Sequence, residues 1–159
     1  MKIEIDVPTQ KLTLLDDGGA VVRSYEISTA ANGVGEESGS NCTPRGRHIV
    51  RAKIGAGAPL RAVFRGRRPT GEVWSQALHE KNPGKDWMLT RILWLSGREP
   101  GFNRLGPVDT MRRMVYIHGS ADTAPMGVPG SHGCIRMRNA DVAELFDLVP
   151  PYTGVNIKA

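Results

Sequence analysis

Two histidines and one cysteine stand near one another in the last third of this 159-residue chain. Cys134 directly follows a glycine, His132 lies two residues before it and His118 sixteen residues before it. A free thiol is only slightly ionised at neutral pH, so it needs an imidazole or a positive environment to act as a nucleophile. Both are available, because Arg136 and Arg138 follow the cysteine closely. The pattern predicts an activated thiolate that transfers acyl groups.

Each residue of this cluster has a predicted catalytic role. Cys134 is the expected nucleophile, with a small buried core thiol as the alternative. Gly133 lets the backbone approach a substrate or adopt a positive φ, and the amides of residues 132–134 could then converge as an oxyanion hole. His118 is the candidate general base that takes the thiol proton and returns it to a leaving amine. His132, two residues from the nucleophile, is the alternative base, although we expect it to position the loop instead.

A metal site is the alternative reading of the same three side chains. Zinc would accept His118, His132 and Cys134 as ligands. No closely spaced fourth ligand is present, and Cys42 sits in what the sequence suggests is an unrelated loop, where we expect a structural role. The sequence therefore predicts neither a metal nor another cofactor.

Arg136 stands two residues after the nucleophile, so in an extended segment both side chains would face the same cleft. A guanidinium can hold a carboxylate through two parallel hydrogen bonds, which would make Arg136 a substrate-binding residue. A salt bridge to Asp109 or Asp141 is the alternative.

The chain has a formal net charge of +5, and its middle contains basic runs at residues 61–68 and at Arg112 and Arg113. Such runs are typical of a solvated face, and they also suit small anionic substrates such as peptides with free carboxylates. They lack interleaved aromatic side chains, and no nucleic-acid motif occurs, so a nucleic-acid partner is not expected.

The first seven residues alternate charged and apolar side chains, which is typical of a strand with one wet face. They have neither the apolar core nor the cleavage site of a signal peptide, and no segment approaches the length that spans a bilayer. We therefore expect a cytoplasmic protein without a membrane partner, with a periplasmic location as the alternative if the protein has an export route.

Short alternating segments predict a mainly β fold and one domain over residues 1–159. The expected strands are residues 2–7, 11–15, 20–27, 48–54, 87–95, 114–117 and 154–157. Residues 31–41 are expected to be a glycine-rich loop. Residues 55–85 are expected to form an elaborated loop or flap, in which 62–64 and 72–74 could be short strands. One short helix is expected over about 140–148, because its apolar residues share one face and Asn139 is a suitable N-cap.

Two segments together resemble the signature of the L,D-transpeptidase catalytic domain, also called YkuD-type. They are His118-Gly119-Ser120 and the stretch Ser131-His132-Gly133-Cys134-Ile135-Arg136-Met137. The resemblance covers nearly the whole chain and implies a mixed β-sheet or sandwich with a flap over the active-site cleft. It also implies Cys134 as nucleophile and His118 as proton shuttle. Ser131, Gly119 and Ser120 join Arg136 as expected substrate-binding residues.

The resemblance also implies a substrate and a reaction. Family members cleave the bond between meso-diaminopimelate and D-alanine in a murein tetrapeptide, passing through an acyl-enzyme. Water as acceptor gives an L,D-carboxypeptidase, which we expect for a cytoplasmic member in peptidoglycan recycling. An amine as acceptor gives a transpeptidase that forms cross-links. A non-enzymatic murein-peptide binder or thiol sensor is the remaining alternative.

Overall fold

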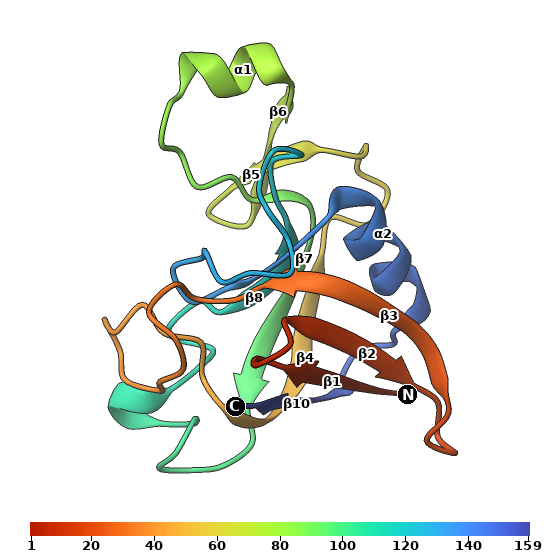
Figure 1. The fold of residues 1–159 in the computed structure, drawn as a ribbon, viewed down its shortest axis with the longest axis vertical. Coiled ribbons are helices and arrows are strands. Elements are labelled where there is room, and N and C mark those ends of the chain that lie inside the picture. Colours follow the sequence, from red (N-terminus) through yellow and green to blue (C-terminus); the bar gives the residue numbers. More distant parts are fainter.

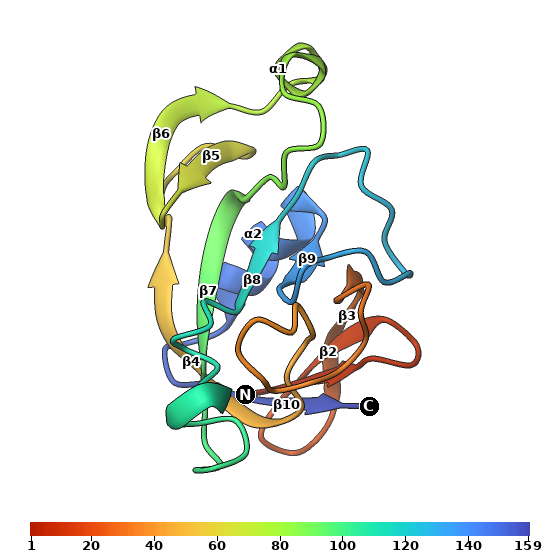
Figure 2. The same ribbon diagram turned by 90° about the vertical axis from the view of Figure 1, so that its left-hand side faces the viewer.

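The computed structural model describes all residues 1–159, and it is dominated by one sheet of ten strands. The strands are β1 (Lys2–Asp6), β2 (Lys11–Leu15), β3 (Val21–Ser28), β4 (Gly46–Ile54), β5 (Ala62–Arg65), β6 (Arg68–Val73), β7 (Leu89–Gly97), β8 (Tyr116–Gly119), β9 (Ile135–Met137) and β10 (Gly154–Lys158). Their spatial order is β4-β10-β1-β2-β3-β9-β8-β7-β5-β6, and β4 also pairs with β7. This extra pairing closes eight of the strands into a ring (Figures 1 and 2). The predicted mainly β fold is confirmed.

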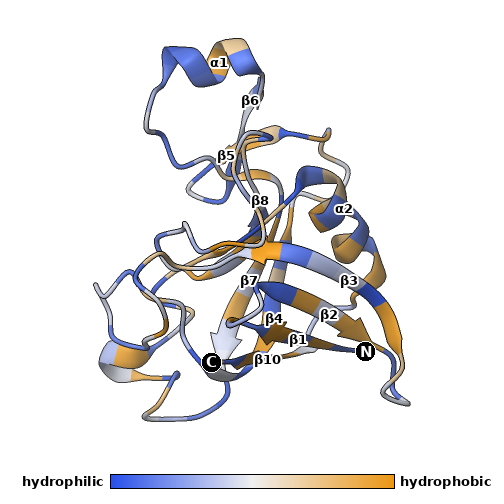
Figure 3. Cartoon of the chain, viewed as in Figure 1, coloured by the Kyte–Doolittle hydropathy of each residue, from blue (hydrophilic) through white to orange (hydrophobic).

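The opening meander follows from alternation of apolar and polar residues. β1 and β2 pair antiparallel, with Ile3 opposite Leu14 and Ile5 opposite Leu12, and all four side chains are fully buried. Their polar neighbours face outward, as the period of two requires. The parallel partner of β1 is β10, so the first and last strands of the chain lie side by side in the sheet. Figure 3 shows hydrophobic residues recurring along these strands.

The main core is a cluster of 19 buried residues contributed by eight strands and one helix. That helix is α2 (Asn139–Leu148), which confirms the helix predicted near 140–148. Its Val142, Leu145 and Phe146 are buried in the same core. The helix contacts β7 and β8, the strand that ends at His118 and Gly119.

Asn139 does not cap α2 as expected, because its side chain is used for tertiary contacts. It is the first helical residue, and the capping position belongs to Arg138, which makes no side-chain capping bond. The Asn139 amide donates to the carbonyl of Ser120 at 2.8 Å and to Asp122 at 2.9 Å, while its oxygen accepts from Thr90 at 2.6 Å. Asn139 thereby fixes the start of α2 against the end of β8.

The segment expected to be a flap contains a β5–β6 hairpin followed by a second helix, α1 (Gln76–Lys81). Ser75 begins α1 by accepting a hydrogen bond from the Leu78 amide. The sequence analysis missed α1 because it is short and buries none of its residues, so no apolar period marks it. Figures 1 and 2 place the hairpin and α1 at one end of the molecule, away from both termini.

A short 3₁₀ turn, η1 (Gly106–Val108), interrupts the loop predicted between β7 and β8. No helix in the chain has the length and apolarity needed to cross a membrane.

Candidate active site

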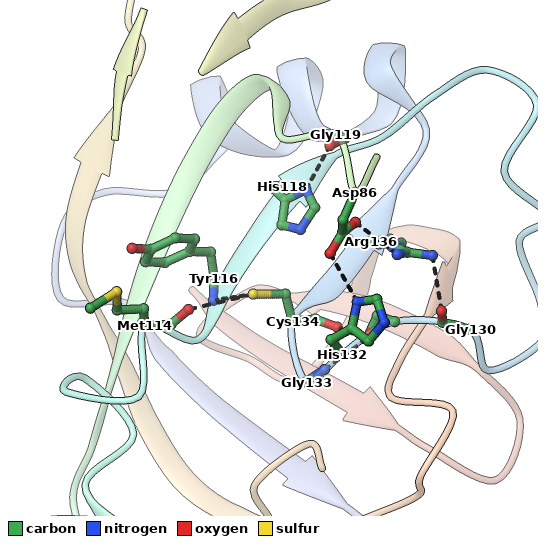
Figure 4. A network of polar contacts seen from close by, with 11 residues as sticks. Asp86, Met114, Tyr116, His118, Gly119, Gly130, His132, Gly133, Cys134 and Arg136 are labelled. Carbon is green, nitrogen blue, oxygen red and sulfur yellow. Dashed lines mark hydrogen bonds and ion pairs between the residues drawn. The ribbon is translucent and has the colours of Figure 1, made fainter. Parts of the chain in front are cut away.

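β8 and β9 bring the predicted catalytic residues together. They are parallel neighbours, with His118 opposite Arg136. Cys134 lies two residues before Arg136, so side-chain alternation places its thiol on the same face as the His118 ring. Figure 4 shows the sulfur and the imidazole on this shared face.

The Cys134 sulfur lies against the backbone that leads into β8. It accepts from the Tyr116 amide at 3.4 Å and donates to the Met114 carbonyl at 3.5 Å (Figure 4). Burial raises the pKa of the thiol to about 11, although the Tyr116 amide, Arg136 and Arg113 act in the opposite direction. A raised pKa favours the protonated thiol, and the activated thiolate expected from the sequence stays a prediction.

One ring nitrogen of His118 is free to accept a proton. Its Nδ1 lies 2.6 Å from the carbonyl oxygen of Gly119, and because a carbonyl can only accept, Nδ1 carries the hydrogen. The other nitrogen, Nε2, is buried without a hydrogen-bond partner and holds the free lone pair. Burial also lowers the pKa of His118, so its resting form is neutral. A neutral thiol and a neutral imidazole therefore share the site.

Hydrogen bonds from Ser131 and Thr43 fix the conformation of the turn before Cys134. The Ser131 hydroxyl donates to the carbonyl of Cys134 at 2.5 Å and accepts from the Gly133 amide at 3.2 Å. Thr43 donates to the carbonyl of Gly133 at 3.0 Å. Gly133 has a φ of +126°, a conformation that favours glycine, as its predicted role requires.

Two amides of this turn remain available for an oxyanion. The Gly133 amide is already bound to Ser131, whereas the N–H groups of His132 and Cys134 have no hydrogen-bond partner in the chain. Amides that point into a site without a partner can stabilise the negative oxygen of a tetrahedral intermediate. The oxyanion hole expected from residues 132–134 stays a prediction, with the His132 and Cys134 amides as its two free donors.

Gly119 and Ser120 contact the protein rather than the cavity at Cys134. A Cβ on Gly119 would lie 2.6 Å from the carbonyl oxygen of Leu89, so glycine allows β7 and β8 to approach. The Ser120 hydroxyl, which is buried, donates to the carbonyl of Met137 at 3.4 Å. These contacts, like those of Ser131, are made within the protein. Direct substrate binding by Gly119, Ser120 and Ser131 stays a prediction.

Arg136 and His132 share a partner that the sequence analysis did not identify. The Asp86 carboxylate accepts from Arg136 Nη2 at 2.7 Å and from His132 Nδ1 at 3.2 Å (Figure 4). Arg136 therefore pairs with neither Asp109 nor Asp141. Its guanidinium also donates to the carbonyl of Gly130 at 3.1 Å, so it is engaged on two sides. No motif marks Asp86, which is 46 residues from His132 and 50 from Arg136.

Arg138, the other cation expected to activate the thiol, points elsewhere. Its guanidinium pairs with Glu26 at 3.0 Å, and about half of each side chain is exposed. It has no part in the network around Cys134.

A cavity of about 290 Å³ opens at Cys134. Its lining residues are Ser38, Gly39, Asn41, Arg112, Arg113, Met114, Val115, His132, Gly133 and Cys134. Two loops therefore form its walls, residues 38–41 and residues 112–115. The expected flap, residues 55–85, contributes none of these lining residues. Asp86, directly after that segment, is the residue that binds His132 and Arg136.

The loop that contains Cys42 is part of this cavity wall, so the expectation of an unrelated loop is wrong. Arg113 donates to the carbonyl of Cys42 at 2.7 Å and also to the carbonyls of Gly35 and Glu36. Gly133 packs against the same Cys42 carbonyl. Both cysteines are free thiols. His118, His132 and Cys134 do not belong to any group of side chains able to hold a metal ion.

Comparison with known proteins agrees with this geometry. The YkuD family model, described as L,D-transpeptidase catalytic domain, matches residues 1–157. The protein named probable L,D-transpeptidase ErfK/SrfK of Salmonella typhimurium is 34% identical over 102 residues, which are 57% of this chain and 33% of that protein. The chain thus spans about a third of this curated relative.

Solved structures share the fold. The L,D-transpeptidase of Xylanimonas cellulosilytica aligns with a TM-score of 0.55 at 23% identity, covering 98% of this chain and 59% of that one. A mutant Enterococcus faecium L,D-transpeptidase aligns with a TM-score of 0.59 at 20% identity, covering 99% and 49%. With the family match over nearly the whole sequence, the chain belongs to the L,D-transpeptidase catalytic domain family, whose members are enzymes.

Proposed function

We propose that this protein is an L,D-carboxypeptidase that removes D-alanine from murein tetrapeptides. The observation that supports it most is the unpartnered Nε2 of His118 on β8, on the side of the sheet where the Cys134 thiol lies just before β9. A binder or thiol sensor has no need of a buried base with a free lone pair. Arg112 and Arg113 line the cavity at Cys134 and suit a donor with free carboxylates.

In the first half-reaction, the Cys134 proton moves to His118 Nε2 as the sulfur attacks the carbonyl carbon of meso-diaminopimelate. The carbonyl oxygen becomes an oxyanion, which the His132 and Cys134 amides would bind. The tetrahedral intermediate then expels the D-alanine nitrogen, which takes the proton from His118. A thioester to Cys134 and free D-alanine result.

In the second half-reaction, His118 takes a proton from water, and the resulting hydroxyl attacks the thioester carbon. The thiolate of Cys134 leaves and regains its proton from His118. The products are the tripeptide acid and the starting enzyme, so no other reactant is needed.

The shape of the cleft supports water as the acceptor. Of the five cavities in the structure, one is lined by Cys134. If the donor peptide fills this cavity, an acceptor amine must be held elsewhere. Orientation provides much of the rate advantage of an amine over water, so an unpositioned amine competes poorly. A cytoplasmic site of action, where recycled tetrapeptides are soluble, belongs to the same proposal.

Transpeptidation is the second candidate, because the ErfK/SrfK relative is named for it. A separate cavity of about 180 Å³ is lined by Asp86 and Arg136 together with Trp87, Ser120 and Pro125, among others. In that case it would be the place of the acceptor.

Product analysis distinguishes the two candidates. A disaccharide tetrapeptide is incubated with the enzyme, with and without millimolar amine acceptor, and the products are identified by mass spectrometry. Hydrolysis predicts tripeptide and free D-alanine as main products in both cases. A dominant cross-linked dimer or D-amino-acid exchange product would overturn the carboxypeptidase proposal and favour transpeptidation. Cys134→Ala serves as the control without catalysis.

A further inference from the structure

Asp86 is the one carboxylate that connects the proposed catalytic groups to one another. It accepts from Arg136 on β9 and from His132 in the turn before Cys134, although it lies in the loop between α1 and β7. Its side chain is 37% exposed, whereas that of Arg136 is 15% exposed. A guanidinium so deeply placed needs a compensating charge, since an unpaired buried cation is costly.

The Asp86 carboxylate also acts on the base and the nucleophile. Burial tends to raise its own pKa, but the charges of Arg136 and His118 and the hydrogen bonds from His132 and Arg136 lower it overall. In turn, its negative charge raises the pKa of His118, which Arg136 lowers. Likewise, the charge of Asp86 raises the pKa of the Cys134 thiol, and the charge of Arg136 lowers it.

We propose that Asp86 is a positioning residue that fixes His132 and Arg136 and provides the negative charge that stabilises the imidazolium formed on His118 during acyl transfer. Without it, Arg136 would stand uncompensated beside a histidine that must become positively charged. The His118 Nδ1 bond to Gly119 fixes the ring, so the charge of Asp86 acts across space rather than by direct contact. This inference rests on the proposed acyl-transfer function.

The charged and titratable groups around Asp86 are Arg136 on β9, His118 on β8, His132 and Cys134 in the turn between them, and the neighbouring Lys85. Asp86 and Arg136 form an ion pair of opposite charges. Removing Asp86 should therefore lower the pKa of the Cys134 thiol, and removing Arg136 should raise it.

The test compares Asp86→Asn with Arg136→Gln by alkylation, which requires no murein substrate. At about pH 8 the rate of iodoacetamide attack follows the thiolate fraction, and peptide mapping separates Cys134 from Cys42. Asp86→Asn should raise the Cys134 rate at least about threefold, and Arg136→Gln should lower it at least about threefold, which is about half a pKa unit each. Glu26→Gln removes a carboxylate that also pairs with an arginine, Arg138, outside this network, and it should leave the Cys134 alkylation rate unchanged.

Turnover provides the second measurement. Asp86→Asn should slow D-alanine release at least about tenfold even though its thiol is more reactive, because the imidazolium is less stabilised. Asp86→Glu should recover part of that loss. If Asp86 were merely structural, Asp86→Asn would lower both the alkylation rate and the rate of D-alanine release, and that result overturns the inference. The inference is also overturned if Asp86→Asn and Arg136→Gln shift the alkylation rate in the same direction or not at all. If the wild type released no D-alanine, the proposed function would fail while the alkylation comparison still decided the role of Asp86.

Discussion

The Nδ1–H of His118 donates to the carbonyl oxygen of its own neighbour, Gly119, at 2.6 Å. This bond fixes the tautomer with the lone pair on Nε2, the nitrogen that lies buried without a partner. The base is therefore oriented by backbone alone, and it depends on no side chain for its tautomer. Because Gly119 is held in β8 between β7 and β9, the sheet itself sets the orientation of the His118 ring.

Replacing His118 tests its role as base. His118→Ala should slow acylation at least about a hundredfold, because the thiol loses its proton acceptor. Iodoacetamide alkylation of Cys134 should slow as well, because the thiol loses the group that takes its proton. His132→Ala is the matched comparison and should have the smaller effect on both rates. A larger loss of alkylation in His132→Ala than in His118→Ala would reverse the assignment.

The raised pKa of Cys134 has a direct consequence for its reactivity. With a thiol pKa of about 11, the wild-type alkylation rate should climb about tenfold per pH unit from neutral pH to about pH 9. The measurement is a series of alkylation rates at single pH values, mapped to Cys134. A plateau reached below neutral pH would mean a preformed thiolate–imidazolium pair instead.

Gly133 should be hard to replace. Its φ is +126°, and a Cβ there would lie 3.2 Å from the carbonyl oxygen of Cys42. Gly133→Ala should therefore reduce the free energy of unfolding by about 1–3 kcal/mol, measured in urea, and should lower turnover by displacing the turn. Gly154→Ala is the control, because a Cβ at Gly154 meets nothing within 4 Å. Equal unfolding midpoints for the two variants would contradict the strain assigned to Gly133.

The sequence was sufficient to predict most of the strands and α2, because they are marked locally by alternation or by an apolar face, but it missed the short strand β9. The catalytic roles of Cys134 and His118, which a short motif marks, stay a prediction. The role of Asp86 was not predictable, since it depends on a contact across 50 residues and no motif surrounds it. The cavity walls at 38–41 and 112–115 were missed for the same reason. α1 was missed because nothing in it is buried.

His48 should make stability depend on pH. It is 1% exposed, Nε2 lies 2.9 Å from the Thr110 hydroxyl, and burial lowers its pKa from 6.5 to about 4. Between those pH values the unfolded chain binds a proton that the folded chain does not, so stability falls as the pH falls from about 6.5 to about 4. The loss should be at most about 3 kcal/mol.

The measurement is the slope of unfolding free energy against pH in that window. Other groups titrate as well, so the wild type is compared with His48→Gln, which should have a shallower slope whatever its absolute stability. If His48→Gln and the wild type had the same slope, His48 would not be the group responsible.

The central claim is that Cys134 carries the acyl group during the reaction. Intact-protein mass spectrometry after rapid mixing with the tetrapeptide tests it most directly, followed by peptide mapping. The predicted adduct has the mass of the tetrapeptide less D-alanine and maps to Cys134. It should be absent in Cys134→Ala, whose turnover should fall at least about a thousandfold. An adduct on Cys42, an adduct that retains D-alanine, or near wild-type turnover in Cys134→Ala would contradict the mechanism.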